Sequence, residues 1–301
     1  GNMYVGLGSS GTLANSWSSL DIIAHEYTHA VTGSSANLTY SNESGALNES
    51  FSDIFGEVIE NSATGTNDWL MGSQRTSGAI RNMSNPNAFN DPDTYLGTNW
   101  FTGTGDAGGV HTNSGVQNFW FFLVAQGGSG TNDNGWAFNF SGIGITKAAA
   151  IAYRNLTVYL TAGSNYNAAR TGSISAAGDL YGAGSVEQNT VIKAWRAVGI
   201  DPCVLTCPAT VVASNTAGQC SAAVSYPPPA TNGLCFTVSS TPPAGSVFAV
   251  GTTSVTATTT SGQTCSFNVT VNDTENPTVS CPGPINVECL TYSGTSASDL
   301  A

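Results

Sequence analysis

The chain has 301 residues, with 19 acidic and 7 basic side chains and a formal net charge of −12. This balance excludes a nucleic-acid-binding surface, because no cluster of cations is present to neutralise phosphates, and it argues equally against docking on an anionic membrane. Hydrophobic residues make up 40% of the chain, so it can bury a core and is not disordered by composition. No run approaches the roughly 18 apolar residues that span a membrane.

The uncharged polar composition of the chain is typical of a secreted protein, although its first residues do not resemble a signal peptide. Gly1-Asn2-Met3-Tyr4 lacks the charged and apolar regions of a signal peptide, so we expect the start to be a cut edge and not a natural N-terminus. Only 9% of residues are charged, while Gly, Ser, Thr and Asn are abundant, a composition common in secreted bacterial proteins. We therefore expect an extracellular, monomeric protein.

Residue types divide the chain near residue 200. Every Lys, Arg and His lies at or before Arg196, and all 7 Cys lie at or after Cys203. Between them, residues 199–202 read as a turn. The dipeptide Cys207-Pro208 recurs as Cys281-Pro282, which indicates a repeated module. We predict domains at residues 1–200 and 201–274, followed by the truncated start of a second repeat at 275–301.

The two domains have different hydrophobic periods. Apolar residues at helical spacing predict that residues 21–31, 45–60, 115–125, 145–160 and 185–198 are helices. Residues 61–106 are rich in Gly, Asn, Asp and Pro and are predicted to form long loops. After residue 203, apolar residues alternate along 254–260 and 265–271, which is typical of strands in a β-sandwich.

The strongest chemical signal is His25-Glu26-Tyr27-Thr28-His29. On a helix, residues four apart share a face, so His25 and His29 can reach one metal while Glu26 lies close to a water bound there. The structural alternative is a pair of histidines satisfied by hydrogen bonds in the core.

A second helix carries further polar groups, including Asn48, Glu49 and Asp53. Glu49 follows His29 by 20 residues, enough for one helix to end and the next to return alongside it. Two His and one Glu leave a fourth position open, which is the pattern of a catalytic zinc site. Asp53 is placed to orient a ligating His through its other ring nitrogen.

These two stretches resemble the zinc helices of the thermolysin-like neutral metallopeptidases. The resemblance continues through Gly108-Gly109-Val110-His111-Thr112-Asn113-Ser114-Gly115 and Asp179-Leu180-Tyr181-Gly182, and it covers essentially residues 1–200. It implies a mostly α-helical catalytic lobe and a zinc endopeptidase acting on protein or peptide substrates. The family also has an N-terminal β-rich lobe, which we expect to be absent here because only about 20 residues precede the zinc helix.

The resemblance assigns a role to each matching residue. It implies that His25, His29 and Glu49 bind zinc, with Asn48 and Asp53 supporting them, and that Glu26 is the general base. It further implies that Tyr40 and His111 stabilise the transition state, that Asp106 orients His111, that Arg81 contacts a substrate carbonyl and that Ile80 lines the pocket for a hydrophobic residue after the scissile bond. Peptide hydrolysis needs such a set: a nucleophilic water, a Lewis acid and donors for the developing oxyanion.

A second metal is implied by hard oxygen ligands, which suit calcium. The match to the single-calcium members, which are similar to pseudolysin and vibriolysin, implies a site made by Asp21, Glu57, Glu60, Asp68 and the backbone carbonyl of Leu70. Members with two calcium ions carry acidic residues at the positions of Leu70 and Ser73, so we expect one structural calcium.

The cysteine-bearing part carries a series of short motifs: Cys207-Pro208, Gly218-Gln219-Cys220, Cys235, Pro242-Pro243-Ala244-Gly245-Ser246, Val250-Gly251-Thr252-Thr253 and Cys265-Ser266-Phe267. With these motifs it resembles a hyalin repeat (HYR), an immunoglobulin-like module. In a secreted protein its cysteines read as disulfides. Four cysteines allow three connectivities; we expect Cys207–Cys265 and Cys220–Cys235, with Cys203 left over. The resemblance implies adhesion or spacing, with an extracellular or cell-surface ligand.

The leading interpretation is a secreted zinc endopeptidase domain followed by HYR modules. A second is an extracellular adhesion or binding protein whose peptidase-like domain is inactive. A third is an active family member of which this chain is an inert fragment.

Overall fold

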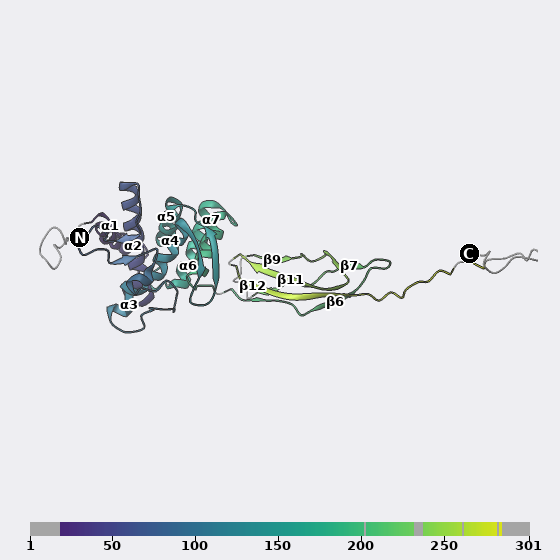
Figure 1. The fold of residues 1–301 in the computed structure, drawn as a ribbon. Helices are drawn as coiled ribbons and strands as arrows, with labels where there is room; N and C mark the ends of the chain where they lie inside the picture. Colours follow the sequence, from purple (N-terminus) through teal and green to yellow (C-terminus); the bar gives the residue numbers. More distant parts are fainter. Residues whose placement is uncertain (1–18, 202, 232–236, 261, 282, 285–301) are drawn as a thin grey trace, which may run out of the picture.

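The computed structural model describes residues 19–201, 203–231, 237–260, 262–281 and 283–284. A helical part with α1 to α7 is followed by an elongated β-rich part, and residues 273–281 extend away from it (Figure 1). Within the described residues, no helix combines the length and the apolar character needed to cross a bilayer.

Two paired helices form the N-terminal side of the helical part. Helix α1 spans Leu20–Ser34 and α2 spans Asn42–Thr64, so both predicted helices exist and run a few residues beyond their predicted ends. Helix α2 buries Leu47, Phe51 and Ile54 completely. It ends where Gly65 adopts φ 78° and donates its N–H to the Asn61 carbonyl, a left-handed cap that suits glycine.

The remaining helices enclose the main core. They are α4 (Gly115–Gln126), α5 (Ile145–Arg154) with a π-helical turn (Asn155–Tyr159), α6 (Tyr166–Tyr181) and α7 (Val186–Ala197). Trp120 of α4 stacks on Trp195 of α7 with ring centroids 4.7 Å apart, and both are fully buried. Sequence periodicity missed α6, because its buried face is built largely from small residues such as Ala169 and Ser173.

The segment between α2 and α4 is more ordered than the predicted long loops. Strand β1 (Leu70–Met71) pairs antiparallel with β2 (Arg81–Asn82), and a 3₁₀ helix covers Pro86–Phe89. Helix α3 (Asp106–Asn113) follows. A hairpin of β3 (Gly127–Thr131) and β4 (Ala137–Ser141), also unforeseen, joins α4 to α5. Two-residue strands leave too short an alternation to be read from sequence.

The β-rich part is a sandwich of short strands. Its larger sheet has the order β6 (Val211–Ser214), β12 (Thr264–Asn272), β11 (Gly251–Thr259), β9 (Val238–Thr241), with β6 parallel to β12 and the other pairs antiparallel. The pairs β7 (Ser221–Ala223) with β10 (Val247–Ala249) and β5 (Leu205–Thr206) with β8 (Ala230–Thr231) complete it. Phe248, Val255 and Phe267 fill the space between the layers. The predicted class, a mostly α-helical lobe followed by an all-β sandwich, is confirmed.

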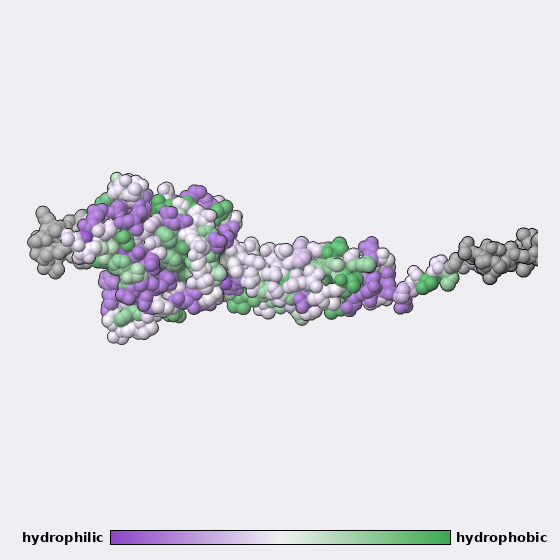
Figure 2. Space-filling view, in the orientation of Figure 1, coloured by the Kyte–Doolittle hydropathy of each residue, from purple (hydrophilic) through white to green (hydrophobic). Residues whose placement is uncertain are grey.

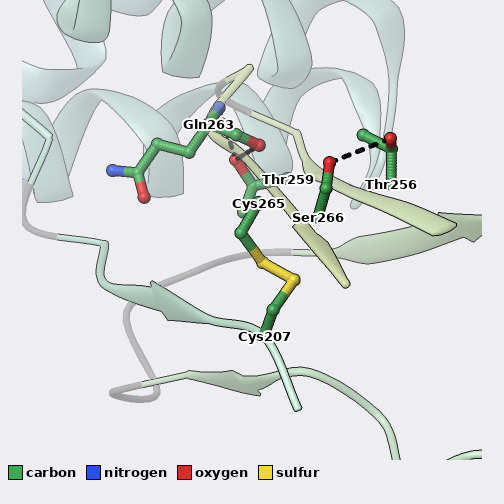
Figure 3. The surroundings of a disulfide bond; sticks show 6 residues. All are labelled: Cys207, Thr256, Thr259, Gln263, Cys265 and Ser266. Atoms are coloured by element: carbon green, nitrogen blue, oxygen red, sulfur yellow. Dashed lines mark hydrogen bonds between the residues drawn. A yellow bond between two sulfur atoms is a disulfide. The ribbon is translucent and has the colours of Figure 1, made fainter. Parts of the chain in front are cut away.

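The disulfide pattern confirms one predicted bridge and corrects the other. Cys207 and Cys265 are bonded, with Cα atoms 5.8 Å apart (Figure 3). Cys220 is an exposed free thiol, and Cys203, expected to be left over, is disulfide-bonded. The predicted Cys220–Cys235 bridge is therefore wrong. The spacing of cysteines along a chain does not reveal which of them the fold brings into reach.

A buried carboxylate joins the two parts. Asp201 has a side chain only 1% exposed and lies 3.0 Å from Arg196 and 3.7 Å from Arg170 in the helical part. From the β11–β12 turn, the Gln263 amide donates to Asp201 Oδ2 (3.1 Å) and to the Cys203 carbonyl (2.7 Å). The Arg196 guanidinium also lies over the Trp136 ring, 4.6 Å from its centroid. These contacts form the interface that orients the β-rich part on the helical part.

The surface polarity differs between the two parts. Residues 203–272 contain no Asp, Glu, Lys, Arg or His. Figure 2 accordingly shows the most hydrophilic residues gathered mainly on the helical part, while much of the β-rich part is pale. The charge of the described protein is thus concentrated around the helical part.

Candidate metal centre and active site

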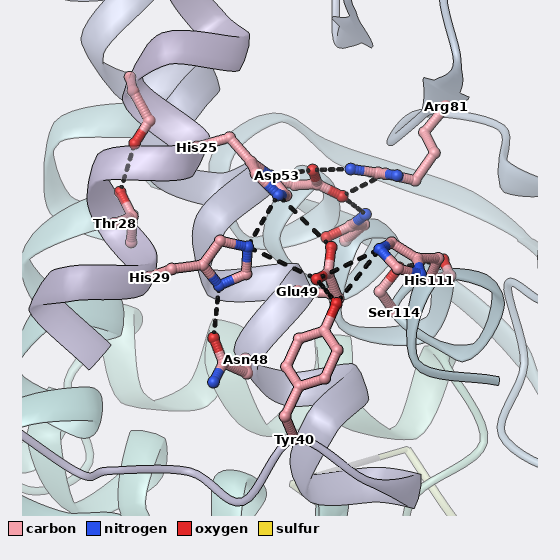
Figure 4. A network of polar contacts seen from close by, with 12 residues as sticks. His25, Thr28, His29, Tyr40, Asn48, Glu49, Asp53, Arg81, His111 and Ser114 are labelled. Atoms are coloured by element: carbon pink, nitrogen blue, oxygen red, sulfur yellow. Dashed lines mark hydrogen bonds and ion pairs between the residues drawn. The ribbon is translucent and has the colours of Figure 1, made fainter. Parts of the chain in front are cut away.

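The packing of α1 against α2 brings three predicted ligands together. His25 Nε2 lies 3.1 Å from His29 Nε2 and 3.4 Å from Glu49 Oε2, and His29 Nε2 lies 3.5 Å from Glu49 Oε1 (Figure 4). The two histidines come from one face of α1, and Glu49 points toward them from α2. The donor atoms therefore converge on one point.

The spacing of these atoms fits a tetrahedral metal. Zinc ligands lie about 2.0–2.1 Å from the ion, so the edges of their tetrahedron measure about 3.3–3.4 Å. The two histidine nitrogens lie 3.1 Å apart and lie 3.4 and 3.5 Å from the two different oxygens of Glu49, separations close to those edges. Glu49 is 1% exposed, and its Oε2 has no hydrogen-bond partner among the described residues. A buried polar atom normally has a partner, and a metal ion would provide one for this oxygen.

Both histidines are oriented through their other ring nitrogen. His25 Nδ1 lies 2.8 Å from Asp53 Oδ1, and His29 Nδ1 lies 2.7 Å from Asn48 Oδ1. These contacts turn the Nε2 atoms toward Glu49. Burial lowers the pKa of His25, but its hydrogen bond to Asp53 and its contact with Glu49 outweigh burial and raise the pKa to about 9.

Arg81 is held by Asp53 from the opposite side. Arg81 Nε and Nη2 donate to Asp53 Oδ2 and Oδ1 at 2.7 and 2.6 Å, a bidentate pair placed by strand β2. Burial alone would raise the pKa of Asp53, but Arg81 and His25 hold it well below its usual range. Asp53 thus stays ionised, and it links the ligand His25 to Arg81.

Tyr40 and His111 approach the same centre from outside the metal helices. The Tyr40 hydroxyl donates to Glu49 Oε1 and lies 3.2 Å from His111 Nε2. Asp106 Oδ1 lies 2.6 Å from His111 Nδ1, and Asp106 Oδ2 accepts the His111 backbone N–H at 2.9 Å. Tyr40 and the side chain of His111 are each about half exposed, so both can be reached from solvent.

A cavity of about 170 Å³ opens beside the ligands. Glu26 is exposed and lies on its wall, together with Arg81 and His111. Its apolar side is made by Ile22, Met71 and Ile80. The cavity therefore combines an apolar pocket with the proposed proton-transfer and donor groups.

A second group of carboxylates lies at the far end of α2. Ligand atoms of Glu57, Glu60 and Asp68 all lie within 4.8 Å of one another. Burial and the charges of Asp68, Glu60 and Asp21 raise the pKa of Glu57 to about 8, although its bond to Asn67 opposes the shift. Glu57 Oε1 is buried without a partner in the described part of the chain. Such crowding of anions fits a bound cation.

Asp21 and Leu70 stand beside this group. Asp21 accepts the backbone N–H groups of Ile22 (2.8 Å) and Gly72, and its charge also raises the pKa of Glu60. Leu70 donates its N–H to Asp68 Oδ1 at 2.9 Å, and its carbonyl accepts the Ser73 N–H at 3.3 Å. The structure thus gathers all the predicted calcium-site residues in one region, with Asp21 outside the tight cluster of three.

Sequence reasoning missed two pocket residues, Ile22 and Met71, and one buried amide, Asn118, which donates to Asp53. Ile22 and Met71 carry no chemical signal, because apolar residues line cores far more often than pockets. Asn118 had a signal: with Gln117 it is one of two adjacent amides inside the apolar run 115–125.

Comparison with known proteins finds a family for each of the two parts. The model of the thermolysin metallopeptidase alpha-helical domain matches residues 36–200, and the model of the HYR domain matches residues 198–271. Bacillolysin from Brevibacillus brevis is 44% identical over 203 residues, covering 66% of this chain and 36% of that protein. Bacillolysin from Bacillus cereus is 42% identical over 204 residues, covering 66% and 35%.

Thermolysin from Alicyclobacillus acidocaldarius is 43% identical over 203 residues and again covers 66% of this chain and 36% of its own. The chain thus spans little more than a third of the length of these relatives. Among solved structures, the precursor of protealysin, a metalloproteinase from Serratia proteamaculans, aligns with 60% of this chain and 57% of its own at 25% identity and a TM-score of 0.49. Because the model of the helical domain matches over half of its residues, the chain belongs to the thermolysin metallopeptidase family, and it carries a HYR domain after the helical domain.

Proposed function

We propose that the chain is the metal-binding part of a secreted zinc endopeptidase that hydrolyses peptide bonds in protein substrates. The observation that carries the proposal is the convergence of His25 Nε2, His29 Nε2 and Glu49 with separations of 3.1–3.5 Å. These three residues would hold the zinc. When bound, the ion would supply a Lewis acid and would lower the pKa of a water at the open position.

The chain's own residues divide the remaining work. Glu26, on the cavity wall beside the ligands, accepts a proton on its carboxylate from the attacking water and passes it to the leaving amine. His111 Nε2 and the Tyr40 hydroxyl, 3.2 Å apart, donate to the oxyanion that develops on the scissile carbonyl. Asp106 holds the His111 ring through Nδ1.

The cavity suggests which substrates fit. Its apolar wall of Ile22, Met71 and Ile80 would favour a hydrophobic residue after the scissile bond. Arg81 uses Nε and Nη2 on Asp53, and its guanidinium also lines the cavity, where it can meet a substrate carbonyl.

We further propose one structural calcium, held by Glu57, Glu60 and Asp68, with Asp21 and the Leu70 carbonyl beside them. The unpartnered Glu57 Oε1 and the raised pKa of that carboxyl support the proposal. The HYR domain would either bind an extracellular partner or hold the peptidase domain at a distance from one.

The decisive test is Glu26→Gln, which keeps the shape of the side chain and removes the base. Zinc content should stay near that of the parent, while turnover of a peptide with a hydrophobic residue after the scissile bond should fall by at least about a hundredfold. Turnover is measured in the complete gene product, because the chain spans only about a third of its relatives. Glu187→Gln, at an exposed ion pair with Lys147, is the control and should leave both values unchanged.

Two outcomes would overturn the assignment. Loss of zinc in Glu26→Gln would show that Glu26 is a ligand and not a base. A parent protein that binds zinc but hydrolyses no peptide would favour an adhesion protein with an inactive peptidase domain.

A further inference from the structure

Asp53 is the centre of a buried hydrogen-bond network in which every partner is a donor. His25 Nδ1 and Arg81 Nη2 contact Oδ1 at 2.8 and 2.6 Å, while Arg81 Nε and Asn118 Nδ2 contact Oδ2 at 2.7 and 2.8 Å. Asp53 is fully buried. A carboxylate offers about four lone-pair sites, so these four contacts fill it.

Asn118 is the partner in this network that the proposed mechanism does not use. It lies on α4 and is 2% exposed. Its Oδ1 is buried and has no hydrogen-bond partner among the described residues. An unsatisfied buried polar atom costs about 1–3 kcal/mol, so an apolar residue would suit this core helix better. The amide is therefore explained by what its other end does at Asp53.

We propose that Asn118 is a positioning residue for the zinc ligand His25, acting through Asp53; the proposal rests on the zinc site proposed above. Without Asn118, Oδ2 would keep only Arg81 Nε, and the carboxylate could turn toward the guanidinium. The Asn118 amide opposes that rotation. It thereby keeps Oδ1 on His25 Nδ1 and His25 Nε2 aimed at His29 and Glu49.

The position of Asn118 in the chain extends this role to the rest of the site. His111 lies on α3, only seven residues before Asn118, and Ser114 between them donates to the His111 carbonyl at 2.6 Å. One short segment thus carries both the His111 donor and the amide that holds Asp53. Through Asn118, the packing of α4 therefore helps to fix the distance between the metal ligands and His111.

A matched residue separates this role from ordinary core stability. Asn155 is 1% exposed, donates one hydrogen bond through Nδ2 to the Ala169 carbonyl at 3.0 Å, and also has a buried, unpartnered Oδ1 in the described structure. It differs from Asn118 in having a backbone carbonyl as its acceptor. Asn155→Ala is therefore the control for Asn118→Ala, and Asn118→Leu removes the donor without leaving a cavity.

The experiment measures zinc affinity by competition with a chelator, together with the absorption spectrum of the cobalt(II)-substituted chain. Loss of a partner behind a ligand weakens metal binding by about 10–100-fold, and we expect about tenfold for Asn118→Ala and Asn118→Leu. Their cobalt spectra should differ from that of the parent, because His25 is no longer fixed. Asn155→Ala should lower thermal stability to a similar degree and leave both zinc affinity and the cobalt spectrum unchanged.

The outcomes separate the two proposals. A parent chain that binds no zinc refutes the zinc site itself. A parent that binds zinc, with Asn118 variants of equal affinity and unchanged spectrum, overturns the positioning role alone. Equal losses in Asn155→Ala, or failure of both Asn118 variants to fold, also overturn it, because positioning predicts a folded chain with weakened metal binding.

Discussion

Glu57 shows how a single buried residue can reveal a ligand. Its side chain is fully buried, Oε2 accepts the Asn67 amide at 2.7 Å, and Oε1 has no partner among the described residues. Burial and three neighbouring carboxylates disfavour its charged form. By contrast, Asp53 is equally buried but has Arg81 beside it, and its pKa moves in the opposite direction. Among the described groups that act on the two carboxyls, Asp53 has a cation in Arg81, whereas those around Glu57 are anions, so a bound calcium would serve Glu57 as Arg81 serves Asp53.

Calcium should therefore stabilise the chain against heat. A ligand that binds only the folded state at 100 times its dissociation constant adds about 2.7 kcal/mol to the free energy of unfolding. Saturating calcium should raise the melting temperature by several degrees, and Glu57→Gln should abolish most of that rise. Calorimetry with and without a calcium-selective chelator measures both. No calcium effect in the parent, or two tight sites by titration, would contradict the single site.

At the scale of elements, the turn at the start of α3 places His111, the proposed oxyanion donor. Asp106, Ala107, Gly108 and Gly109 have φ values of 51°, 49°, 91° and 81°, four successive left-handed residues. Left-handed backbone costs an L-residue roughly 1–2 kcal/mol. The turn folds Asp106 back so that its carboxylate meets both the ring and the backbone N–H of His111. The strained residues thus lie in the turn that orients the His111 ring.

Gly108→Ala should disturb this turn more than backbone strain alone explains. A Cβ on Gly108 would lie 2.3 Å from Asn42 Oδ1, whereas at Gly65, which is also left-handed with φ 78°, it would meet nothing within 4 Å. Gly65→Ala should therefore cost about 1–2 kcal/mol, and Gly108→Ala about 1–3 kcal/mol more. Gly108→Ala should also lower turnover, by up to about a thousandfold if His111 is lost as a donor.

Unfolding by urea and turnover measurements compare these two variants. Zinc content should remain unchanged in both, because neither touches a ligand. Equal stability and equal turnover in the two variants would show that the turn tolerates a side chain and does not fix His111.

At the scale of the whole molecule, the interface between the helical and β-rich parts is polar. A crevice of about 320 Å³ there is lined by Trp136 and Arg196 on one side and by Leu205, Gln263 and Thr264 on the other. The turn that joins β3 to β4 contacts α7 through Asn132, whose amide donates to the Arg196 and Ala197 carbonyls at 3.0 and 3.1 Å. The Arg196–Asp201 pair thus lies between both parts of the protein.

Replacing Gln263 by Ala should weaken this interface and let the two parts vary more in their relative orientation, without unfolding either part. The variant loses the hydrogen bonds to Asp201 and the Cys203 carbonyl but keeps the buried Arg196–Asp201 pair. Small-angle X-ray scattering should show a broader distribution of interatomic distances than in the parent. Gln219→Ala, in the turn before β7, is the control and should scatter like the parent. A Gln263→Ala curve that superposes on the parent would show that other contacts hold the orientation.

The sequence alone determined the helices of the metal site and the class of each part. The spacing of His25 and His29 by four residues can place both on one helix face, and apolar periodicity located α1, α2, α4 and α7. The alternation around Val255 and Phe267 indicated the sandwich. These features are local, because a helix or strand imposes its period on neighbouring residues. One bridge, Cys207–Cys265, was also foreseen.

Only the tertiary structure decided which distant residues meet. The helix α6 was invisible because small residues bury a face without an apolar period, and the free Cys220 shows that spacing along a chain does not set a disulfide. Asn118 reaches Asp53 across 65 positions of sequence, and Gln263 reaches Asp201 across 62. Such contacts follow from how helices and strands pack against each other, a global property that no local pattern encodes.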